Sequence, residues 1–127
     1  MRLDLFAAAL AVIVSGCLFE PGLGSSTRNC DVSQPVADGV RINITDPTGF
    51  VGYCMGLHGD GIEGKPLAKV TAEGVVWFAL PGAGNYYGTV SVQAADDKYC
   101  ADTMDAFFEY HGTGVLQIEA ERARVCS

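Results

Sequence analysis

The sequence predicts an all-β protein, a small antiparallel β-sandwich that is stapled by two disulfide bonds. Three observations indicate this fold. Apolar and polar residues alternate with a period of two from residue 40 onwards. Turn-forming residues recur at the short intervals that are typical of sandwiches. Four cysteines follow residue 17, an even number that suits a paired framework.

The first half of the domain begins with the alternating segment 40–45, which predicts a strand. The residues Asp-Pro-Thr-Gly at 46–49 end that strand in a turn. A short apolar run follows at 50–55, and a glycine-rich segment at 56–64 is expected to be a loop.

Two further strands are expected at 67–72 and 75–80, joined as a hairpin through Glu73-Gly74. A turn at 81–85 leads into the segment 89–94, where polar residues alternate strictly with valine and alanine. Such alternation is typical of a strand with one buried face.

The segment 102–111 fits two structures. As a strand it places on one face Met104, Ala106, Phe108 and Tyr110. As a helix capped by Asp102 it places on one face Thr103, Phe107 and Tyr110. We favour the strand, because residues 112–114 would then join it as a hairpin to the last strand, 115–125.

These seven short strands predict one sandwich domain over residues 40–127. One hydrophobic core is enough for a domain of this length. The large side chains that fill this core or lie at its edges are expected to be those of Trp77, Phe78, Tyr87, Phe107 and Phe108.

Cys30, Cys54, Cys100 and Cys126 are expected to form two disulfides in an exported chain. Four cysteines allow three pairings. We favour Cys30 with Cys54 and Cys100 with Cys126, since each bond would tie a terminal segment to a neighbouring strand. No two of these cysteines have the close spacing of a metal-thiolate site.

The N-terminus has the features of an export signal. Arg2 precedes an apolar run from Leu5 to Val14, which is shorter than the roughly 20 residues of a membrane span. The run ends in Val14-Ser15-Gly16-Cys17, which resembles the lipobox of bacterial lipoproteins. That resemblance implies a signal peptide at 1–16, cleavage before Cys17 and lipidation of Cys17, which would anchor the protein to a membrane.

Residues 17–39 are rich in glycine, proline and serine and are expected to form a flexible tether behind the lipid. Leu18 follows the cysteine where aspartate would retain a lipoprotein at the inner membrane. The resemblance therefore implies a place in the bacterial envelope, most simply at the outer membrane and facing the periplasm.

The domain itself resembles carboxypeptidase-regulatory-like and transthyretin-like sandwiches. The similarity lies in the strand and turn at 42–49 and in the entry 82–87 into the alternating strand 89–94. It implies an immunoglobulin-like or transthyretin-like arrangement. The shared motif is architectural, so no catalytic residue carries over.

The formal net charge of −7 and the scattered basic residues oppose binding to nucleic acid. The segment 59–65 has the glycine and lysine spacing of a phosphate-binding loop, but Pro66 stands where a magnesium-binding hydroxyl is required. We therefore expect neither nucleic acid nor a nucleotide as a partner, and no cofactor.

Two groups of side chains are candidates for metal ligands. His58 with Asp60 and Glu63 offers a loose set, and His111 stands alone. A second group gathers carboxylates without the spacing of an EF-hand loop, and consists of Asp96, Asp97, Asp102 and Asp105. Solvated loops explain both groups, so no metal site is expected, and calcium-dependent binding remains an alternative.

The sequence thus predicts a lipid-anchored, noncatalytic sandwich for binding or structural support in the envelope. Its partners would be the membrane, through Cys17, and an envelope protein or glycan. Tyrosine gives contact area at a low cost in entropy, and the contact residues are expected to be Tyr53, Tyr86, Tyr87 and Tyr99. A carboxylate-dependent envelope hydrolase is the alternative of another class.

Overall fold

A computed structural model describes residues 27–127, and in this part the chain forms eight strands and no helix. The strands are β1 (Gly39–Asn43), β2 (Cys54–Gly59), β3 (Leu67–Lys69), β4 (Val75–Ala79), β5 (Gly84–Gln93), β6 (Cys100–Tyr110), β7 (Val115–Glu119) and β8 (Glu121–Cys126). The expected signal peptide, Cys17 and residues 18–26 of the expected tether lie outside the described residues.

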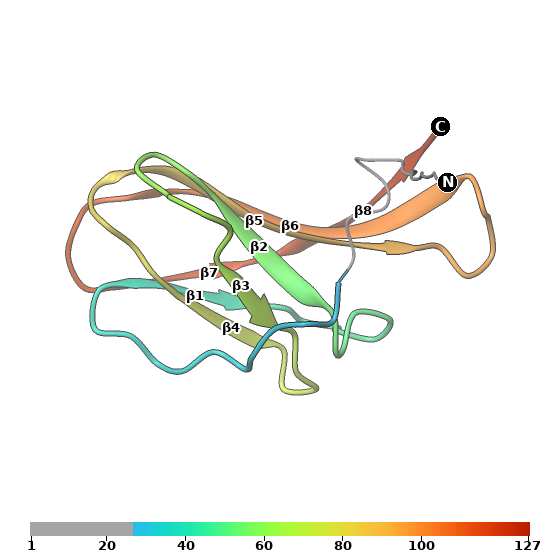
Figure 1. The fold of residues 1–127 in the computed structure, drawn as a ribbon, viewed down its shortest axis with the longest axis horizontal. Coiled ribbons are helices and arrows are strands. Elements are labelled where there is room, and N and C mark those ends of the chain that lie inside the picture. Colours follow the sequence, from blue (N-terminus) through green and yellow to red (C-terminus); the bar gives the residue numbers. More distant parts are fainter. Residues whose placement is uncertain (1–26) are drawn as a thin grey trace, which may run out of the picture.

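The strands form two sheets that pack face to face, as Figure 1 shows. Sheet A has the order β4-β1-β7, and sheet B has the order β3-β2-β5-β6-β8. The prediction of an all-β sandwich is confirmed. One pair departs from a wholly antiparallel arrangement, because β1 runs parallel to β7.

The core lies between the two sheets. Sheet A contributes alternate residues of β1 and β4, and sheet B contributes the faces of β2, β5 and β6 that point towards sheet A. The largest side chains that are fully buried are Phe50, Ile42, Met55, Leu57, Val40, Val70, Val76 and Val90. Burial of each such side chain contributes about 1.5–3 kcal/mol, so this layer supplies the main driving force for folding.

The strands β5 and β6 form the longest strand pair of sheet B. They pair without interruption from Gly84 opposite Tyr110 to Gln93 opposite Ala101. The strand alternative for 102–111 is therefore confirmed. Its even-numbered residues from Met104 to Tyr110 face the core, as the alternation predicted.

Both expected hairpins are wrong. The turn at Glu73-Gly74 joins β3 in sheet B to β4 in sheet A, and residues 112–114 join β6 in sheet B to β7 in sheet A. Positive φ angles at Gly74 and Gly114 make these sharp turns accessible. Each turn takes the chain from sheet B to sheet A, because the apolar face of one sheet is buried only when the other sheet covers it.

The last expected strand, 115–125, is also divided. Its first half is β7, which pairs with β1, and its second half is β8, which pairs with β6. The change of sheet occurs at Ala120, whose N–H donates to the carbonyl of Asn43. A strand that switches sheets in this way forms one corner of the sandwich.

The favoured disulfide pairing, Cys30–Cys54 and Cys100–Cys126, is the pairing in the structure. Residues 27–38, expected as part of a flexible tether, pack along the domain instead. The N–H groups of Cys54 and Lys69 donate to the carbonyls of Thr27 and Asp31. The tether expectation is therefore wrong for this part, because backbone hydrogen bonds and a disulfide hold it.

Candidate functional site

Three aromatic rings form a row across the outer face of sheet B. His58 of β2 lies opposite Tyr87 of β5, and Tyr87 lies opposite Phe107 of β6. The ring centroids of His58 and Tyr87 are 4.8 Å apart, and those of Tyr87 and Phe107 are 5.3 Å apart. Directly opposed residues of neighbouring strands share a face, so the sheet register itself assembles this row.

Phe107 is more exposed than Tyr87, with 74% of its surface accessible against 37%. Its neighbours Ala106 and Phe108 point to the core side, so the alternation of β6 turns Phe107 outwards. The strand β8 pairs with β6 only as far as Asp105, and it does not cover this ring. Of the residues expected as core fillers and edges, Phe107 therefore does not fill the core but lies on the outer face of sheet B.

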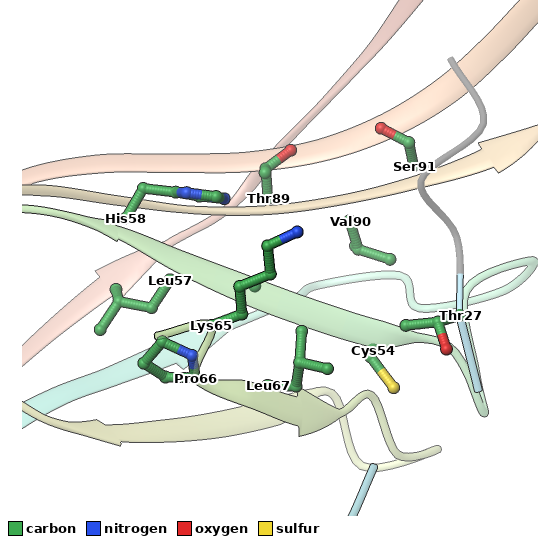
Figure 2. Close-up of a pocket in the computed structure, with 11 residues that line it drawn as sticks. Thr27, Cys54, Leu57, His58, Lys65, Pro66, Leu67, Thr89, Val90 and Ser91 are labelled. Carbon is green, nitrogen blue, oxygen red and sulfur yellow. The ribbon is translucent and has the colours of Figure 1, made fainter. Parts of the chain in front are cut away.

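A hollow of about 230 Å³ lies beside His58 on the same face. Gly56 has no side chain and leaves the space open, while Thr89, Leu67 and Pro66 contribute to its walls. Figure 2 shows the Lys65 side chain extending across β2 towards β5. The aromatic row therefore ends at a hollow that carries one cationic side chain.

The four tyrosines expected as contacts differ in their surroundings. Tyr86 is 3% exposed and its hydroxyl donates to the carbonyl of Gly82 at 2.6 Å, so the expectation that it is a surface contact is wrong. Tyr53 packs against the core, and the Arg28 guanidinium lies 4.3 Å from its ring centroid. Tyr87 and Tyr99 are 37% and 59% exposed.

Of these tyrosines, only Tyr87 belongs to the aromatic row, and sequence reasoning did not single out its neighbours His58 and Phe107 as contact candidates. A signal for Phe107 existed, because the strand alternative for 102–111 put the even-numbered residues on one face. Phe107 then had to lie on the other. Tyr99 stands apart in the loop before β6, with the Lys98 ammonium 5.2 Å from its ring centroid.

The segment 56–64, expected as a loop, is partly a strand. Residues 56–59 belong to β2, and the remainder turns back towards β3. Gly61 and Gly64 have positive φ angles in this turn, and the Asp60 carboxylate accepts from the N–H of Asn85. A connection between two antiparallel strands lacks the strand-to-helix geometry of a phosphate-binding loop.

The acidic residues after β5 are engaged in ion pairs and hydrogen bonds. The Arg124 guanidinium lies 3.0 Å from the Asp96 carboxylate and 2.8 Å from that of Asp102. The hydrogen bond from Arg124 lowers the pKa of Asp96, and both carboxylates raise the pKa of Arg124. The Asp105 carboxylate accepts from the hydroxyls of Thr89 and Thr103.

Within residues 27–127, no three His, Cys, Asp or Glu side chains gather closely enough to hold a metal ion. Cys30, Cys54, Cys100 and Cys126 are all in disulfides, so none of these four offers a thiolate nucleophile. Nor does this part of the chain contain an apolar helix of membrane-spanning length.

Comparisons with protein-family models, with curated proteins and with solved structures gave no match to this chain.

Proposed function

We propose that the protein is a lipid-anchored envelope lipoprotein whose β-sandwich is a noncatalytic binding module. In this proposal Cys17 carries the lipid, and the outer face of sheet B around His58, Tyr87 and Phe107 contacts an envelope partner. The single observation that supports it best is the exposure of Phe107. A large apolar side chain at 74% exposure, stacked on a second aromatic ring, is typical of an interaction surface.

The build of the domain supports a binding role. Two disulfides and an uninterrupted β5–β6 ladder hold the aromatic row on a rigid sheet. A preformed surface loses little conformational entropy when a partner binds. Tyr87 stacks on the Phe107 ring from one side, and His58 stacks in turn on Tyr87, so the row supports the exposed ring before contact.

Site-specific photocrosslinking tests the binding face. A photoreactive phenylalanine analogue at position 107 should yield an adduct with an envelope component in the native cell. The matched control is the same analogue at Gln117, an exposed residue of β7 in sheet A. Adducts of equal yield from both positions, or from neither, would contradict the proposed face.

The anchor is tested separately by the intact mass of the membrane-purified protein. We expect a chain that begins at Cys17 and carries the added mass of acyl chains, because stable anchoring takes more than one chain. Cys17→Ala should move the protein out of the membrane fraction. A mature chain that begins at Leu18 or later would exclude the anchor and leave the binding face untouched.

A further inference from the structure

The strand β6 is paired along only half of its outer edge. It is eleven residues long, and β8 pairs with it from Cys100 to Asp105. Beyond Asp105, no strand of the described part of the chain lies beside residues 106–110 on that side of sheet B. The reason is the corner at Ala120, before which the chain runs as β7 in sheet A.

The hydrogen-bond pattern shows which backbone groups face this open edge. The carbonyl of Cys100 accepts from Ala94 on the β5 side, whereas the carbonyl of Tyr99 accepts from Ser127 beyond β8. Even-numbered residues therefore bond towards β5 and odd-numbered residues towards β8. The Cα atoms of Cys100 and Cys126 are 4.0 Å apart, the short spacing of an opposed pair without mutual hydrogen bonds.

The register of β5 and β6 is continuous to Tyr110, so this alternation continues to the end of the strand. The N–H and C=O groups of Phe107 and Glu109 consequently point to the open edge. Unpaired groups of this kind are a template on which another extended chain can add as a further strand.

The surroundings of the open edge are acidic. A hollow of about 420 Å³ lies at its inner end and includes among its lining residues Asp105, Phe107, Glu119, Glu121 and Arg122. Glu109 is exposed on the edge itself. The one arginine is occupied, because its guanidinium donates to the carbonyls of Asp46 and Thr48. The surroundings of the open edge thus hold four carboxylates, those of Asp105, Glu109, Glu119 and Glu121, and one arginine.

We propose that the open edge of β6 at residues 106–110 binds an extended, basic peptide segment of a partner as an added β-strand. This inference rests on the proposed binding function and names its partner class. The backbone groups of Phe107 and Glu109 pair with the added strand, the Phe107 ring packs on one of its apolar side chains, and the carboxylates attract its Lys or Arg side chains. A second copy of this chain is disfavoured, because two acidic edges would meet.

The probe is a synthetic heptapeptide of alternating Lys and Val, added to the full isotope-labelled chain in detergent. We expect the amide protons of Phe107 and Glu109 to exchange at least about tenfold more slowly at saturating peptide, since a strand partner protects them. The amides of Ala106 and Phe108 are the internal control, because they face β5 and should not change. Failure of the Lys/Val peptide to slow Phe107 and Glu109 at millimolar concentration would overturn the inference.

Two control peptides distinguish strand addition from charge attraction alone. An alternating Glu and Val peptide should bind at least about tenfold more weakly, a difference of about 1.4 kcal/mol. A Lys and Val peptide in which every backbone nitrogen is methylated keeps the charge but has no backbone donor on either edge, and should give no protection. Equal protection by the N-methylated peptide would refute strand addition.

Charge reversal makes the test independent of one peptide sequence. The variant Glu109→Lys with Glu121→Lys should prefer the acidic peptide, and its unbound spectrum shows whether it remains folded. Protection that rises with protein concentration alone would assign the edge to a second copy and refute the inference. If crosslinking at position 107 succeeds while all peptides fail, the binding face stands and the added strand does not.

Discussion

The rings of Tyr87 and Phe107 stack across β5 and β6 with their centroids 5.3 Å apart, although Phe107 remains 74% exposed. An aromatic pair of this kind contributes about 0.5–1.5 kcal/mol beyond the area it buries. That gain is small beside the burial that an inward-facing phenylalanine would bring. The position of Phe107 therefore suits contact with another molecule better than stabilisation of the fold.

Substitutions of an exposed and a buried aromatic residue should differ in their effect on stability. Phe107→Thr keeps a strand-forming residue and should lower the free energy of unfolding by about 1 kcal/mol or less. Tyr86→Ala should lower it by about 3–5 kcal/mol, because Tyr86 is 3% exposed within the core. Urea unfolding measures both. Equal losses would show that Phe107 is a structural residue.

The alternation of the sequence was sufficient to predict individual strands and their faces. Val40 and Ile42 of β1, and Met104 of β6, are buried as their period-two pattern indicated. The same pattern does not specify partners. A turn such as Glu73-Gly74 suits a hairpin or a crossing between sheets equally well, and the choice is made by which layer still has an apolar face to cover.

The candidate site was harder to predict, for two physical reasons. Gly56 and Gly59 lower the strand propensity around His58, so the end of β2 resembled a loop. Phe107 was grouped with the fillers and edges of the core, although the strand alternation turned it outwards. The row forms only because the register of three strands places these residues opposite one another. That register could not be predicted from a single sequence.

Gly39 should tolerate no side chain. A Cβ atom there would clash with the Phe78 carbonyl oxygen, because β1 and β4 are closely paired at this point. We expect Gly39→Ala to lower the free energy of unfolding by about 1–3 kcal/mol, the usual cost of overpacking. Gly82→Ala is the matched control, since nothing lies within 4 Å of its Cβ position. Thermal unfolding of the two variants tests the difference.

Each disulfide should contribute similarly to global stability but protect a different part of the chain. The bonds close loops of 24 and 26 residues, for which the chain-entropy model gives about 3.5 kcal/mol each. Paired Cys→Ser substitution of Cys100 and Cys126 should speed amide exchange in β8, and that of Cys30 and Cys54 in residues 27–38. Identical exchange changes in both double variants would contradict this assignment.

Acid should destabilise the protein through two carboxylates with lowered pKa values. Hydrogen bonds from Thr48 lower the pKa of Asp46, and a hydrogen bond from Arg124 lowers that of Asp96, each from an ordinary value of 3.8. A carboxylate that is more acidic in the folded state binds fewer protons there than in the unfolded state. Its stabilisation is complete above pH 3.8 and is lost as the pH falls through the lower folded-state pKa.

The variant Arg124→Met should lose the part of this pH dependence that belongs to Asp96. Arg124 is on β8, while Asp96 follows β5 and Asp102 is on β6, so the ion pairs fasten an edge strand to its neighbours. Urea unfolding at a series of pH values below 5 should give a shallower decline for Arg124→Met than for the unsubstituted chain. Asp46→Asn, combined with it, should flatten the curve further, because Thr48 stabilises the second carboxylate independently. Parallel curves for all three proteins would mean that other carboxylates govern acid unfolding.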